Sequence, residues 1–173
     1  MLSQLLAQTP IWVWVLLVFL ITRGIAAMKP GETALGKLLI VPALFTVWGI
    51  WSLSTRYGAA PTAWGEWLAG IAVGMGLGWA LLRRATLRIN PSTGALWRSA
   101  DYSQLPLLLV TFLVKYGFEV AFAVSPALAG SGGFSAAYLL SSGLLTGIFI
   151  GKYCRYLAAS RQAAVPSAEG MSL

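Results

Sequence analysis

Long apolar stretches alternate with short polar segments along this chain, and their lengths predict membrane-spanning helices. A stretch of about 18 apolar residues is long enough to cross the hydrocarbon layer of a bilayer as a helix. Five such stretches predict helices over residues 9–27, 34–54, 63–82, 103–124 and 134–157. We therefore expect an all-α integral membrane protein, with one membrane domain over residues 1–160 and a flexible tail over residues 161–173.

The composition favours lipid over water as the solvent of this chain. Of its 173 residues, 58% are hydrophobic and only 10% are charged. A water-soluble domain carries roughly 25% charged residues, because its surface must face water. The net charge of +7 is not accompanied by a basic stretch with interleaved aromatic residues, so we expect the lipid bilayer as a partner and no nucleic acid.

Two residue counts limit the chemistry. The chain has no histidine, which is the commonest general base and metal ligand, and a single cysteine, Cys154. An internal disulfide is excluded, and we expect no metal and no cofactor. A membrane enzyme is the weakest functional hypothesis, because only a lysine or a glutamate remains for acid–base chemistry.

The basic residues predict an orientation. Ten of the twelve lysines and arginines would lie on one side of the membrane, only Arg56 would lie on the other, and Lys115 would lie within it. Positive charge accumulates on the cytoplasmic side, so we expect the N-terminus outside and the C-terminus in the cytoplasm. The membrane that we expect is a bacterial inner membrane. The ten are Arg23, Lys29, Lys37, Arg83, Arg84, Arg88, Arg98, Lys152, Arg155 and Arg161.

The longest polar segment between helices predicts a short cytoplasmic β-hairpin over residues 86–98. Leu87-Arg88-Ile89 and Ala95-Leu96-Trp97 flank a turn sequence that runs from Asn90-Pro91 to Gly94. The arginines around this segment either signal topology alone, which we favour, or also attract anionic lipid head groups. They are Arg83, Arg84, Arg88 and Arg98.

Glycines recur every fourth residue in two of the predicted helices. Such stripes allow close helix packing, either within one chain or at the seam of a homodimer. We favour packing within the chain, of helix 63–82 against helix 134–157. The stripes are Gly70, Gly74 and Gly78 in the first helix and Gly143, Gly147 and Gly151 in the second.

Helix 103–124 contains the only pair of ionisable residues near the middle of a span. Lys115 and Glu119 are four residues apart and share one face. A charge at that depth costs at least about 2.5 kcal/mol, so we predict that they pair and that helix 134–157 supplies polar partners. These partners are Tyr138, Ser142 and Thr146, with Tyr116 at the edge. The pair either lines a functional cavity or only fixes helix register, and the sequence favours neither.

The chain resembles a family of small proteobacterial inner-membrane proteins known only as a domain of unknown function. The opening Gln8-Thr9-Pro10-Ile11-Trp12-Val13, the basic first loop and the segment from Arg88-Ile89-Asn90-Pro91 to Gly94 carry this resemblance. In plan it is also similar to small CcdC-type membrane proteins. The resemblance implies a fold plan and no activity. Two functional hypotheses precede the enzyme: a small-solute or proton-coupled carrier or channel-like unit, and an accessory or scaffold subunit of a larger membrane complex.

Overall fold

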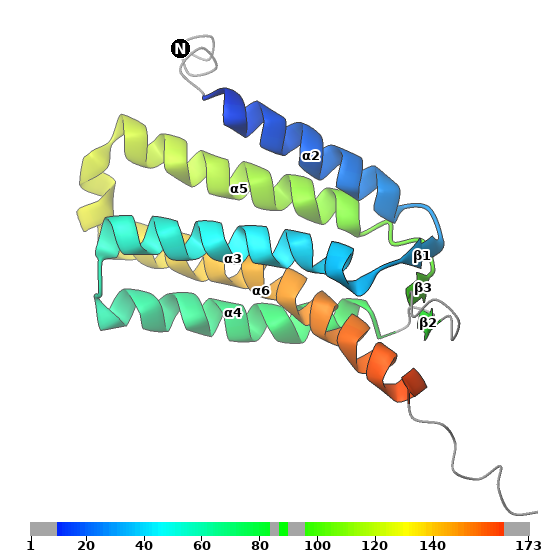
Figure 1. Cartoon of the computed structure of the whole chain (residues 1–173). Coiled ribbons are helices and arrows are strands. Elements are labelled where there is room, and N and C mark those ends of the chain that lie inside the picture. Colours follow the sequence, from blue (N-terminus) through cyan, green and yellow to red (C-terminus); the bar gives the residue numbers. More distant parts are fainter. Residues whose placement is uncertain (1–9, 84–86, 90–95, 165–173) are drawn as a thin grey trace, which may run out of the picture.

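A computed structural model describes residues 10–83, 87–89 and 96–164, which form a bundle of five long helices (Figure 1). Successive helices run in opposite directions, so the bundle has two ends. A small sheet lies at one end, the sheet end, and the 3₁₀ helix η1 (Pro126–Gly130) lies at the other, the η1 end. The helices are α2 (Ile11–Ala27), α3 (Leu35–Tyr57), α4 (Pro61–Leu81), α5 (Gln104–Val124) and α6 (Gly132–Ala164).

The five predicted helices are confirmed, with differences at their ends. α3 continues three residues beyond the predicted end at residue 54. α6 continues to Ala164, so residues 161–164 of the predicted tail belong to this helix. The rest of the tail, residues 165–173, lies outside the described residues.

Three helices indicate a membrane protein. Within the described residues, α3, α5 and α6 are long and apolar enough to cross a membrane. α2 is apolar but has only 17 residues. α4 has 21 residues and is not among these three helices.

The sheet links the connection between α2 and α3 to the connection between α4 and α5, at the sheet end of the bundle. β2 (Leu87–Ile89) pairs antiparallel with β3 (Leu96–Arg98), and residues 90–95 between them lie outside the described residues. β1 (Gly31–Thr33), which the sequence analysis did not predict, pairs antiparallel with the other edge of β3. A three-residue strand shows too little alternation to be recognised from sequence. Because β2 also contacts α6, the sheet is attached to the bundle.

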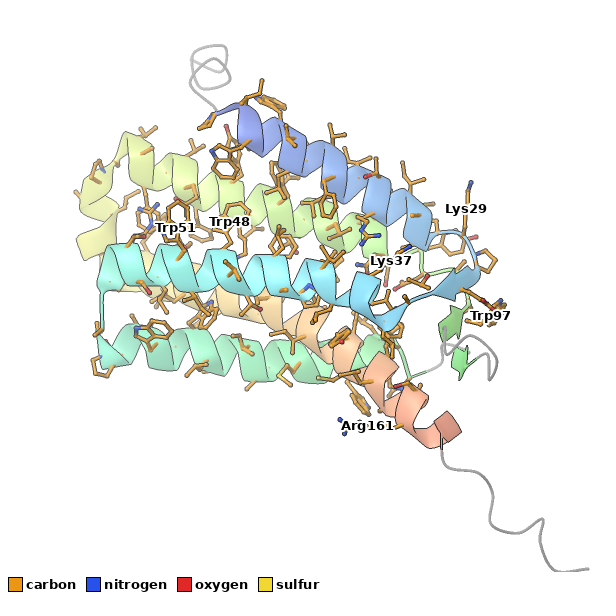
Figure 2. The ribbon with its side chains drawn as sticks, viewed as in Figure 1. Lys29, Lys37, Trp48, Trp51, Trp97 and Arg161 are labelled. Atoms are coloured by element: carbon orange, nitrogen blue, oxygen red, sulfur yellow. The ribbon has the colours of Figure 1, made fainter. Side chains whose placement is uncertain are left out.

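Lysine and tryptophan side chains are distributed differently between the two ends of the bundle. Lys29, Lys37 and Trp97 lie at the sheet end, whereas Trp48 and Trp51 lie toward the η1 end (Figure 2). Arg83 is exposed just beyond α4, and Arg88 and Arg98 lie on β2 and β3. Arg84 lies outside the described residues.

The glycine stripes pack α4 against α6 within the chain. A Cβ built on Gly70 would lie 2.5 Å from the carbonyl oxygen of Leu140 and 2.9 Å from the amide nitrogen of Leu144. On α6, a Cβ on Gly147 would overlap in the same way with the backbone of Ile71. Only glycine permits this separation of the two backbones. All six predicted glycines face this seam, so the stripes are already occupied within one chain.

Candidate functional site

The last turn of α3 brings a basic side chain into the bundle. Gly58, with φ of 57°, ends the helix, and its amide donates a hydrogen bond to the carbonyl of Ser54 at 3.1 Å. Arg56 therefore lies on α3, one turn beyond Ser52 and on the same face. The sequence analysis placed Arg56 in a loop because it ended the helix at residue 54. Gly58 is the signal in the sequence that would have extended the helix to residue 57.

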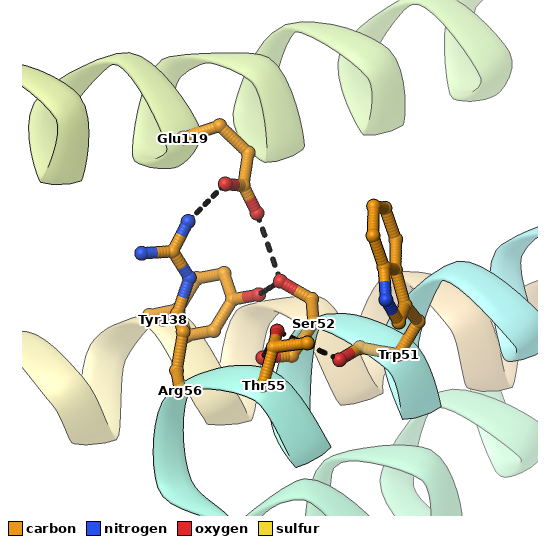
Figure 3. Close-up of polar contacts among 6 residues, drawn as sticks. All are labelled: Trp51, Ser52, Thr55, Arg56, Glu119 and Tyr138. Carbon is orange, nitrogen blue, oxygen red and sulfur yellow. Dashed lines mark hydrogen bonds and ion pairs between the residues drawn. The ribbon is translucent and has the colours of Figure 1, made fainter.

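Glu119 of α5 connects three helices. Its Oε2 forms a salt bridge with Arg56 Nη2, and its Oε1 accepts a 2.9 Å hydrogen bond from Ser52 Oγ (Figure 3). Ser52 Oγ also shares a 2.7 Å hydrogen bond with the hydroxyl of Tyr138 on α6. The guanidinium of Arg56 lies 4.2 Å from the ring centre of Phe122, one turn along α5. The carboxylate is thus held by α3 and, through Ser52, linked to α6.

Lys115 has partners other than Glu119. Its Nζ donates a 2.8 Å hydrogen bond to Ser142 Oγ on α6 and lies 5.7 Å from the ring centre of Trp48 on α3. The side chain is only 4% exposed. Two separate contacts therefore replace the predicted Lys115–Glu119 ion pair. Arg56, on the neighbouring helix α3, forms the salt bridge with the Glu119 carboxylate, whereas Lys115 extends toward α6.

The remaining predicted site residues also lie inside the bundle. Tyr116 stacks on Phe112, with ring centres 5.8 Å apart. Thr146 is fully buried one turn beyond Ser142 on α6, and its hydroxyl has no hydrogen-bond partner among the described residues. The polar line predicted on α6 thus contacts α5 and α3 at two levels, through Tyr138 and Ser142.

A cavity lies beside Glu119, toward the η1 end of the bundle. This η1-end cavity measures about 370 Å³ and is enclosed by α2, α3 and α5. Its polar lining comes mainly from Ser52, Thr55, Arg56, Tyr116 and Glu119. Its remaining walls are apolar and aromatic, from Pro10, Trp12, Val13, Trp48, Trp51, Val120 and Ala123.

A second buried ion pair lies near the sheet end. Lys152 Nζ of α6 is 2.6 Å from Asp101 Oδ2, with side chains 3% and 9% exposed. Lys152 also donates a 3.1 Å hydrogen bond to Ser103 Oγ. Burial alone would raise the pKa of the Asp101 carboxyl, but the charge of Lys152 and the hydrogen bonds from Lys152 and Ser103 lower it below its ordinary value. The sequence analysis counted Lys152 as a cytoplasmic charge and did not predict this pair.

A second cavity lies beside this pair. This sheet-end cavity measures about 220 Å³ and is lined by α2, β1, α3, α5 and α6. Its ionisable lining includes Arg23, Glu32, Lys37 and Lys152. Val41 and Phe149, which also line it, belong to the apolar core of the bundle.

An apolar layer separates the two cavities. Leu20 of α2, Phe45 of α3 and Leu108 of α5 are each 0% exposed. Phe45 stacks on Phe149 of α6, with ring centres 5.2 Å apart. On α3, the layer occupies the six-residue step between Pro42 of the sheet-end cavity and Trp48 of the η1-end cavity. At 1.5 Å per residue this step is about 9 Å.

Comparison with known proteins identifies the family of this chain. Neither the curated proteins nor the solved structures yield a match. A family described as a family of unknown function (DUF6622) matches residues 1–167. The domain of unknown function implied by the resemblance is therefore confirmed, and the CcdC-type likeness and the proteobacterial source stay predictions. The chain belongs to the family of unknown function DUF6622.

Proposed function

We propose that this chain crosses the bacterial inner membrane five times, with the sheet end in the cytoplasm, and acts as a small-solute or proton-coupled carrier or channel-like unit. The observation that carries this proposal is the arrangement of the cavities. Two cavities with polar residues in their linings lie toward opposite ends of the bundle, on either side of the same apolar layer. A carrier needs access from each side and a barrier between them, and this arrangement supports both requirements.

The position of Glu119 supports coupling to protons. Ionisable residues inside a membrane bundle mark substrate or proton pathways more often than structural sites. Glu119 is 30% exposed and lines the η1-end cavity, so a proton has a path to it. Protonation removes the charge that holds Arg56, which weakens the contact between α3 and α5. Binding of a proton is thereby linked to the packing of the helices that enclose the cavity.

Lys115 marks the inner limit of the same polar region. It lies one turn closer to the apolar layer than Glu119 and contacts the hydroxyl of Ser142 and the ring of Trp48. Glu119 lies close enough for its charge to act on Lys115. This proximity suits a site at which Glu119 exchanges partners between Arg56 and Lys115.

Proton flux in proteoliposomes tests this function. The full chain is reconstituted into vesicles that contain a pH-sensitive dye, and a potassium diffusion potential drives proton uptake. We expect uptake at least tenfold faster than in protein-free vesicles, and Glu119→Gln to reduce it to the protein-free rate. Val73→Ala, on the exposed face of α4, is the matched control and should keep the wild-type rate.

Thiol accessibility tests the barrier independently. In a Cys154→Ser background, Ala123→Cys lines the η1-end cavity and Ala26→Cys lines the sheet-end cavity. Each should react with a membrane-impermeant maleimide from one side only, and from opposite sides. Proton uptake at the protein-free rate would exclude the proton-coupled carrier, and reaction of both cysteines from the same side would exclude a barrier between the cavities.

A further inference from the structure

An apolar groove adjoins the η1-end cavity. This groove, between α2 and α3, has a volume of about 650 Å³. Trp12, Trp48 and Trp51 line both the groove and the cavity. The rest of the groove wall is aliphatic, from Leu16, Ile40, Ala43, Leu44 and Val47. The cavity, with its polar end beside Glu119, and the groove, which runs along α3, therefore adjoin at these three tryptophans.

The groove lies on the surface that faces lipid. Ile40 is 41% exposed and Val47 is 67% exposed, although both belong to a helix apolar enough to cross a membrane. In the bilayer, such a surface contacts hydrocarbon chains rather than water. A molecule that fills the groove and the cavity together must carry a hydrocarbon chain and a polar head.

The charges of the polar end limit the head group. Among the described residues, Arg56 and Glu119 are the charged residues that line the cavity, and their charges cancel. A charged head group could pair with Arg56 or Glu119 only by weakening the salt bridge between these two residues. A hydroxyl-bearing head without charge can instead donate to Glu119 and accept from Arg56 while the salt bridge stays intact.

We infer that the substrate of the proposed carrier is an uncharged amphiphile, with one hydrocarbon chain in the α2–α3 groove and a hydroxyl-bearing head in the η1-end cavity. This inference rests on the proposed function and adds the class of molecule that the site selects. Trp48 occupies the junction between chain and head, since it lines the groove and lies over Lys115. The bilayer is the source of the substrate, which enters laterally between α2 and α3.

Three probes with the same brominated chain test head-group selection. One carries a glycerol head, one a phosphate and one a trimethylammonium group. Bromine quenches tryptophan fluorescence at short range, and three tryptophans line the site. With the full chain in phosphatidylcholine nanodiscs, we expect the glycerol probe to bind at least fivefold more tightly than either charged probe. Equal quenching by all three would mean that the groove takes up any lipid chain, and would overturn the inference.

Charge substitutions should change the order of the probes. Glu119→Gln leaves Arg56 uncompensated and should make the phosphate probe the tightest. Arg56→Gln leaves Glu119 uncompensated and should favour the trimethylammonium probe. An unchanged order in both variants would place the head group elsewhere and overturn the inference.

A steric pair of variants locates the chain. Ala43→Phe fills the groove and should weaken the glycerol probe at least fivefold, whereas Ala72→Phe, on the exposed face of α4, should leave its affinity unchanged. Equal weakening by both would refute the groove as the binding site. Proton flux with no head-group selection would refute this inference alone. Selection of the glycerol probe with flux at the protein-free rate would refute the carrier and leave a binding site.

Discussion

Replacing Gly70 by alanine should separate α4 from α6, and the cost follows from the geometry of the seam. The new Cβ would lie 2.5 Å from the carbonyl oxygen of Leu140 and 2.9 Å from the amide nitrogen of Leu144. Carbon and carbonyl oxygen atoms in close contact are normally about 3.3 Å apart or more. Both neighbouring atoms belong to the backbone, so no side chain can rotate away. The helices must therefore move apart by nearly 1 Å.

That movement weakens contacts along the whole seam. A gap of about 0.5 to 1 Å forfeits a quarter to a half of the dispersion energy between two surfaces, and dispersion is the main attraction between helices in lipid. Overpacking a tight contact costs about 1 to 3 kcal/mol. We therefore expect Gly70→Ala to lower the free energy of unfolding by about 1 to 3 kcal/mol.

Gly76→Ala is the matched control on the same helix. A Cβ on Gly76 meets no atom of the described residues within 4 Å, and alanine favours helix over glycine by up to about 1 kcal/mol. Its free energy of unfolding should equal or slightly exceed that of the unsubstituted chain. Unfolding in mixed micelles at increasing fractions of dodecyl sulfate, followed by tryptophan fluorescence, measures both variants. Equal stability of Gly70→Ala and Gly76→Ala would refute the tight α4–α6 seam.

Three further substitutions probe the polar groups. Because the fold lowers the pKa of Asp101, its ionised carboxylate stabilises the folded chain above about pH 4, and this stabilisation is lost as pH falls toward the folded pKa. Asp101→Asn should remove this acid sensitivity from thermal melting curves. Arg56→Gln should lower the free energy of unfolding by about 1 to 3 kcal/mol, and the double variant with Glu119→Gln should recover part of that loss in the micelle assay. Lys115→Met removes a buried cation, so the free energy of unfolding should change by less than about 1 kcal/mol or rise. A decrease in the free energy of unfolding of more than about 3 kcal/mol would contradict this interpretation of the Lys115 contacts.

The helices were predictable because the bilayer imposes a length on them. A helix must carry about 20 apolar residues to cross the hydrocarbon layer, and this requirement is visible in one sequence without knowledge of neighbours. The glycine stripes were predictable for a similar reason, since a period of four places small residues on one face. Their pairing, α4 with α6, follows from there being two such stripes that match in spacing.

The ends of the helices and the ion pairs were less accessible to sequence reasoning. Ending α3 at residue 54 removed Arg56 from the bundle and left Glu119 with Lys115 as its nearest expected partner. The pair between Asp101 and Lys152 depends on how α5 and α6 are aligned, because the two residues are far apart in the sequence. That alignment brings Lys115 to Ser142 and Ser103 to Lys152, and spacing within one helix contains no information about it.

Two cations compete for one carboxylate in this bundle, and the rotation of α3 decides which of them is bound. Spacing on α5 alone favours Lys115, because residues four apart share a face. In the structure Glu119 forms a salt bridge with Arg56, and this salt bridge links α3 to α5 beside the η1-end cavity. The two pairings therefore differ in whether α5 binds its own lysine or its neighbour. An exchange from Arg56 to Lys115 would release α3 and widen the cavity without leaving the carboxylate unpaired, which is the local rearrangement that the proposed carrier requires.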